Sequence, residues 1–194
     1  MKEIIILIFI TFSTLSIFSQ TLQDGQKRWS EENKLTVDDF KIKTSDDNNE
    51  LIYSQFMISH YISGFDFMKK NLNQKIQNVF LGNASWIDTT KINEINPQIE
   101  FQQLQFDLAE IHTRKFRKKA LQNKKKIAKG FDIIQKINNE IMAEFSEIRL
   151  KLMKDTEGGT NEEKVKEWRK KIDTELNVLN DFRYENKKRI KLSK

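Results

Sequence analysis

The stretch that decides the fold is FQQLQFDLAEIH, residues 101–112. Its apolar residues recur every three or four positions and form one helical stripe: Phe101, Leu104, Leu108 and Ile111. Upstream, Asn96 and Pro97 are typical of a helix start, because Asn caps the first turn and Pro needs no hydrogen bond there. We therefore predict a core helix that begins near Pro97 and runs to about Leu121.

The second half of this helix and the residues after it are strongly basic. No acidic residue occurs between Ile111 and Gly130. The candidate contacts to an anionic partner are Arg114, Lys115, Lys118, Lys119, Lys124, Lys125 and Lys126. Two interpretations stay open: a patch for lipid headgroups, anionic polysaccharide or nucleic acid, or a solvated helix end whose lysines complement the helix dipole. Nucleic acid is not expected, because no binding motif accompanies the charge.

Apolar periodicity elsewhere predicts strands first and helices afterwards. Runs of β-branched and aromatic residues indicate strands, and stripes at intervals of three and four indicate helices. The expected strands are 35–40, 51–62 and 76–81, and the expected later helices are 131–153 and 160–182. Thr160 and Glu163 have the spacing of a capping box at the start of the last helix. The predicted class is α+β, with a small antiparallel sheet followed by three long helices.

The N-terminus has the pattern of a secretory signal peptide. Lys2 is positively charged, residues 4–17 are almost wholly apolar, and Ser19-Gln20 offers a cleavage site. The apolar run is short for a membrane-spanning helix, although an uncleaved anchor stays an alternative. We expect a signal peptide at residues 1–19, one domain at 20–186 and a basic, frayed tail at 187–194. The protein is then exported, to the periplasm or outside the cell.

Composition excludes several kinds of site. The chain of 194 residues has no Cys, so it has no disulfide, no thiolate metal site and no lipid anchor on Cys. It has two histidines, and 34 basic residues against 28 acidic ones give a net charge of +6. His60 lies in an expected strand and is either a stray metal ligand or a packed or edge-strand histidine. The second interpretation is favoured, because no other histidine is near in the sequence.

Several short segments share their order and spacing with one protein family. They are Trp29, LTVDDFK at 35–41, SWI at 85–87, FDLAEI at 106–111, RKFRK at 114–118, DTEGG at 155–159 and residues 161–168. Together they resemble a bacterial family of proposed secreted zinc-dependent proteases, known as domain of unknown function nine-twenty-two. The resemblance covers most of the chain after the leader. It implies a zincin-like fold in which the helix of residues 101–121 takes the place of the metal-binding helix.

The chain departs from this family where the chemistry would occur. Members carry His-Glu-Gln-x-His, where two histidines bind Zn²⁺ and the Glu acts on the metal-bound water as a general base. Here Phe101 and Gln105 replace the histidines, Gln102 replaces the Glu, and Gly158 stands at a further histidine position. His112 lies roughly 10 Å further along the helix than Gln105 and does not rebuild a three-ligand site. No metal or other cofactor is expected.

Three functions are consistent with the sequence. The first is a non-catalytic relative of a secreted metalloprotease, kept as a binding or structural module of the cell envelope. The second is an active zinc peptidase with ligands that the sequence does not reveal. The third is an interaction protein of the envelope surface that uses its basic helix. The expected partner is therefore a protein or an anionic envelope component, and peripheral contact with a membrane is consistent with the charge.

Overall fold

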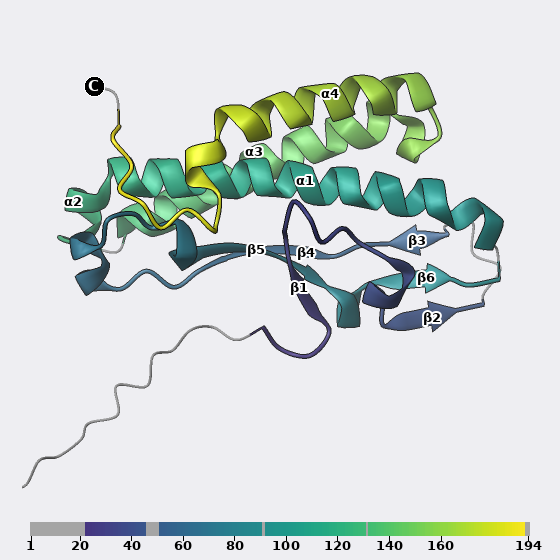
Figure 1. Cartoon of the computed structure of the whole chain (residues 1–194), viewed down its shortest axis with the longest axis horizontal. Coiled ribbons are helices and arrows are strands. Elements are labelled where there is room, and N and C mark those ends of the chain that lie inside the picture. The colour runs from purple at the N-terminus through teal and green to yellow at the C-terminus, as the bar shows by residue number, and fades with distance from the viewer. Residues whose placement is uncertain (1–21, 46–50, 91, 131, 193–194) are drawn as a thin grey trace, which may run out of the picture.

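A computed structural model describes residues 22–45, 51–90, 92–130 and 132–192. The α+β class is confirmed, with small sheets on one side and helices on the other (Figure 1). The long helix α1 (Ile92–Gln122) packs on the strands, and α3 (Asp132–Asp155) and α4 (Glu162–Val178) pack on α1. The four-residue helix α2 (Lys124–Ile127) follows α1. The predicted leader lies outside the described residues.

The strands form two sheets rather than one. The first is antiparallel, in the order β1 (Gln26–Arg28), β5 (Ile76–Leu81) and β4 (Phe56–His60). The strand predicted at 76–81 is confirmed as β5, and the segment before it connects β4 to β5 as a hairpin. This connection contains the short 3-10 helices η2 (Gly64–Met68) and η3 (Asn73–Lys75).

The second sheet is mixed, which the sequence analysis missed. Its central strand β6 (Trp86–Asp88) pairs in parallel with β2 (Ile42–Thr44) and antiparallel with β3 (Ile52–Tyr53). The single strand expected at 51–62 is therefore wrong. The chain divides at Gln55, whose backbone N–H donates to Ser85 Oγ at 3.0 Å, so β3 and β4 join different sheets.

The strand predicted at residues 35–40 is also wrong, because a capping box folds this segment into the 3-10 helix η1 (Val37–Asp39). The Asp39 carboxylate accepts from the Thr36 backbone N–H at 2.7 Å and from its hydroxyl at 3.1 Å. Leu35 and Phe40, which flank this turn, are both buried. The apolar residues were correctly placed in the core, although the backbone between them is a turn.

Helix α1 confirms the predicted core stripe but not the predicted start. All four residues of the stripe are buried. The helix begins at Ile92, so Pro97 lies inside its first turns. At the start of α4, the cap is Asn161 rather than Thr160, since Asn161 Oδ1 accepts from the Lys164 backbone N–H at 3.2 Å. Thr160 Oγ donates instead to the Glu157 carbonyl at 2.8 Å.

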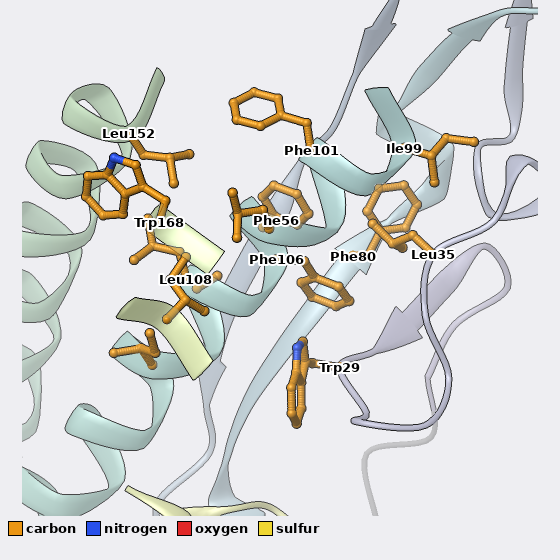
Figure 2. Packing of buried hydrophobic residues seen from close by; sticks show 14 of the residues in the cluster. Trp29, Leu35, Phe56, Phe80, Ile99, Phe101, Phe106, Leu108, Leu152 and Trp168 are labelled. Carbon is orange, nitrogen blue, oxygen red and sulfur yellow. The ribbon is translucent and has the colours of Figure 1, made fainter. Parts of the chain in front are cut away.

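Aromatic rings fill the space between α1 and the first sheet (Figure 2). Phe106 of α1 stacks on Phe56 of β4 with ring centroids 5.3 Å apart, and Phe40 meets Phe80 edge to face at 5.0 Å. Such ring pairs contribute roughly 0.5–1.5 kcal/mol beyond their buried area. On the other side of α1, Leu108 faces Leu152 of α3 and Trp168 of α4. The helix is therefore covered on both sides.

The last described residues are held against the hairpin between β4 and β5. Asn73 is 1% exposed, and its amide Nδ2 donates to the carbonyls of Asp181, Arg183 and Asn186 at 2.9–3.2 Å. Asn71 Nδ2 donates to the Lys188 carbonyl at 2.6 Å. The expectation of a frayed tail is thus wrong for this part of it.

Arg117 joins the helices to the sheet. Its side chain is fully buried, and Nη1 lies 2.7 Å from Glu110 Oε1. Nε and Nη2 donate to the Ile76 carbonyl at 3.0 and 2.9 Å, and Nη1 also donates to the Phe182 carbonyl at 2.9 Å. One guanidinium therefore connects α1, β5 and η6 (Asn180–Phe182).

We predict that Arg117→Met destabilises the protein by roughly 3–5 kcal/mol, because Glu110 loses a buried partner and two carbonyls lose their donors. The neighbouring Lys118 is exposed, so Lys118→Met changes stability by only about 0.5 kcal/mol. Urea unfolding followed by circular dichroism measures both. Equal stability of the two variants would contradict the structural role of Arg117.

Candidate functional site

Phe101, at the first expected ligand position, is packed into the core. Its side chain is 1% exposed. The short helix η5 (Glu157–Gly159) lies against it. A Cβ on Gly159 would lie only 2.5 Å from Phe101 Cγ, so the ring requires a glycine there. The contact is made by Gly159 and not by Gly158, which the resemblance places at the further histidine position. Gly158 has φ of +69° and open space where its side chain would be.

The other two expected positions form a closed hydrogen-bond chain. Gln102 and Gln105 are both buried, and Gln105 Nε2 donates to Gln102 Oε1 at 3.1 Å. Gln105 Oε1 accepts from Arg149 Nε of α3 at 2.8 Å. Arg149 also donates to the Ser54 carbonyl at 3.3 Å, and its guanidinium lies 5.3 Å from the ring centroid of Phe56. The positively charged Arg149 of α3 therefore lies beside the two amide side chains.

Asp107 gathers polar side chains from three parts of the chain, and the sequence analysis did not assign it a role. Trp29 Nε1 donates to Asp107 Oδ1 at 2.7 Å, and Gln103 Nε2 donates to the same oxygen at 2.6 Å. Arg169 of α4 pairs with Oδ2, and Lys34 Nζ lies 3.9 Å from Oδ1. The carboxylate is fully buried but borders a cleft of about 380 Å³.

Glu110 forms buried ion pairs with both arginines of the basic run, Arg114 and Arg117. Its Oε1 accepts from Arg114 Nε at 3.1 Å and from Arg117 Nη1 at 2.7 Å. Arg114 Nη1 also donates to the Leu176 carbonyl at 2.7 Å, and its side chain is 3% exposed. The expectation that Arg114 contacts an anionic partner is therefore wrong, because its charge is buried and paired inside the fold.

Lys115 and Lys119 also lie against carboxylates. Lys115 Nζ lies 2.7 Å from Glu144 Oε1 and 3.6 Å from Glu175 Oε2. Lys119 Nζ lies 3.2 Å from Glu140 Oε2. Both are partly exposed, but their charge is balanced locally. Of the seven candidate contacts, Lys118, Lys125 and Lys126 are exposed, and Lys124 at the start of α2 is half-buried.

His112 borders a small cavity of about 50 Å³ between α1, α3 and α4. Its Nδ1 donates to the Leu108 carbonyl at 2.9 Å, which leaves Nε2 as the acceptor of the neutral ring. Among the described residues, Nε2 has no hydrogen-bond partner, and Glu144 Oε1 lies 3.7 Å away. The rings of His60 and Phe116 meet edge to face, with centroids 5.5 Å apart, as expected of a packed histidine.

Comparison with models of known families, with characterised proteins and with solved structures gives no match. In the part of the chain that the structure describes, no group of three or more His, Asp or Glu side chains is arranged to hold a metal ion. A search of the same part finds no helix that is long and apolar enough to cross a membrane.

The contact of Gly159 with Phe101 gives the first prediction for this site. Gly158→Ala should lower the free energy of unfolding by about 1–2 kcal/mol, because alanine disfavours the left-handed backbone at this position. Gly159→Ala, at φ of +94°, adds a clash with the ring and costs about 1–3 kcal/mol more. In a Phe101→Ala background the additional cost should disappear. Urea unfolding of the four variants measures the difference, and an additive result would contradict the contact.

The pKa values of the two histidines determine part of how the stability of the fold depends on pH. Burial lowers the pKa of His112 and of His60 below the ordinary value of 6.5. The unfolded chain therefore takes up protons that the folded chain does not, and stability falls as pH falls below 6.5. We predict that His60→Gln/His112→Gln has a flatter stability profile between about pH 7 and 5 than the wild type. Thermal unfolding across this range measures both, and parallel profiles would contradict the prediction.

Proposed function

We propose that this protein is an exported, non-catalytic relative of zinc-dependent proteases with a zincin-like fold, and that it serves as a binding or structural module of the cell envelope. The observation that carries the proposal is the filled helix face at Phe101, Gln102 and Gln105. Its first position packs on Gly159, and its other two positions are tied to each other and to Arg149.

The replacement side chains lack the chemistry of metal-assisted hydrolysis. Phe101 has no lone pair for a metal. Gln102 accepts no proton near neutral pH, so the roughly 10²–10⁴-fold contribution of a general base is lost. The amide oxygen of Gln105 is bonded to the Arg149 guanidinium at 2.8 Å, and this positive charge opposes the approach of a second cation. Phe101 and Gln105 therefore disfavour the binding of Zn²⁺, and Gln102 removes the general base.

The arrangement of the elements supports the same proposal. The helix that bears these residues packs directly on the small sheets, and the two later helices cover its other side. The loop before α4 reaches the start of the buried stripe through Gly159. The resemblance implies this place for a metal-binding helix, whereas the further ligand position, Gly158, faces open space and the neighbouring Gly159 makes the contact.

The peptidase alternative has one cluster in its favour. His112 Nε2 lacks a hydrogen-bond partner among the described residues and faces Glu144, and Glu175 borders the same cavity. Lys115 Nζ, however, lies within 3.6 Å of both carboxylates and takes the position that a metal ion would need. If the protein nevertheless binds zinc, this cluster is the first place to search, because it joins an imidazole nitrogen to two carboxylates.

We predict that the wild-type protein retains no stoichiometric zinc after incubation with zinc and desalting, as measured by elemental analysis. Phe101→His alone and Gln102→Glu alone should change nothing, because one ligand or one base does not make a site. Only the combination Phe101→His, Gln102→Glu and Gln105→His, with or without Gly158→His, is expected to restore binding. It should also reduce stability, because polar groups enter packed space.

One tightly held zinc per wild-type chain would overturn the proposal. His112→Ala then identifies the site: loss of the metal would assign it to the cluster of His112 and Glu144. Retention of the metal would direct the search to His60 and to carboxylates elsewhere. Cleavage of a peptide library by the purified wild type, abolished by a chelator, would support the peptidase alternative independently.

A further inference from the structure

Two large apolar side chains project from the short helix η2 into solvent. Phe65 is 77% exposed and Met68 is 68% exposed. Side chains three residues apart on a 3-10 helix lie directly above one another, so these two point the same way. Single exposed apolar residues are ordinary on a protein surface, but Phe65 and Met68 together form a small exposed apolar patch.

Hydrogen bonds and an ion pair hold the backbone of η2, which carries these two side chains, in place. Asp66, which lies between them in the sequence, is 2% exposed. Its Oδ2 accepts from the Ser63 backbone N–H at 2.7 Å and from the Ser63 hydroxyl at 2.9 Å. Its Oδ1 pairs with Lys75 Nζ at 3.3 Å. The carboxylate anchors the turn from inside, and this anchoring keeps Phe65 and Met68 outside.

Three segments distant in sequence bring positive charge to the same end of the molecule (Figure 1). Helix α2 packs on η2, and Lys124 Nζ donates to the Lys69 carbonyl. The Asn71 amide holds the C-terminal segment at the Lys188 carbonyl. The exposed cations of these segments are Lys69, Lys70, Lys125, Lys126, Lys188 and Arg189. With Phe65 and Met68 they make up what we call the docking face.

Little negative charge opposes these cations. Asp66 is buried and pairs with Lys75 and, at 3.5 Å, with Lys69, so Lys69 is the one cation of this set whose charge is partly balanced by it. No acid occurs among residues 112–130, and the C-terminal segment from 183 to 192 has Glu185 as its single acid. Burial lowers the pKa of Lys124, and the nearby charge of Arg189 lowers it further. Positive charges from α2 and from the C-terminal segment therefore repel each other, and a bound anion would relieve this repulsion.

We propose that the docking face binds an anionic phospholipid surface, with Phe65 and Met68 entering the boundary between headgroups and acyl chains and the cations contacting the headgroup phosphates. A membrane meets both requirements, an apolar layer for the two side chains and negative charge around it. Anionic polysaccharide offers the charge without an apolar layer. The proposal goes beyond the non-catalytic role and does not depend on it.

The test measures binding of the full mature chain to vesicles by flotation. Vesicles of phosphatidylcholine with phosphatidylglycerol should bind the protein, and vesicles of phosphatidylcholine alone should bind it much more weakly. Added salt should weaken the binding. Phe65→Ser/Met68→Ser should reduce affinity at least tenfold, and Lys125→Gln/Lys126→Gln should reduce it by about fivefold per lysine.

Matched controls lie on the other helices. Leu150→Ser removes an apolar residue of α3 that is 69% exposed, and Lys166→Gln/Lys170→Gln removes two exposed lysines of α4. These variants should bind within about twofold of the wild type, and circular dichroism checks that all variants fold. In Phe65→Trp, the indole fluorescence should shift to shorter wavelength with the phosphatidylglycerol vesicles.

Three results would overturn the proposal. The first is no binding to phosphatidylglycerol vesicles at low salt. The second is unchanged affinity of the folded Phe65→Ser/Met68→Ser variant, which would leave a purely electrostatic contact. The third is tight, salt-dependent binding to an anionic polysaccharide such as heparin without binding to vesicles, which would assign the face to a soluble polyanion.

Discussion

The fold depends on two buried carboxylates, Asp107 and Glu110, one turn apart on α1. Burying a carboxylate is unfavourable by several kcal/mol unless it is paired and hydrogen-bonded. Asp107 draws in the N-terminal segment through Trp29 and α4 through Arg169. Glu110 holds Arg117, which reaches β5 and the residues after α4. Elements from both ends of the chain are thus fixed to one helix by charge, and the aromatic core packs around that arrangement.

The sequence predicted the parts of the fold that depend on local periodicity. The stripe of α1, the strand β5 and the helix α3 follow from the spacing of apolar residues alone. The division between β3 and β4 does not, because it depends on which sheet each segment joins. The turn η1 was missed because the carboxylate of Asp39, rather than side-chain alternation, sets its backbone.

The candidate site was partly predictable for the same reason. Helical spacing places Phe101, Gln102 and Gln105 together, but Arg149 comes from another helix and no local pattern identifies it. The basic run was misread in part because charge alone does not separate buried from exposed cations. A usable signal was present: arginines follow Glu110 at four and seven positions on one helix face, whereas the exposed positions carry lysine.

The hydrogen bonds from Asn73 to the C-terminal segment affect the order in which the protein folds. Its hydrogen bonds join residues that are 108 to 113 positions apart. Contacts of such long range form late, since the intervening chain must be ordered first. The pairing of Asp107 with Arg169 likewise spans 62 positions. A ribosome that is still making α4 therefore carries a chain in which Asn73 has none of its C-terminal acceptors, and the helices and the first sheet are joined at this end only after residues 181–186 have been made.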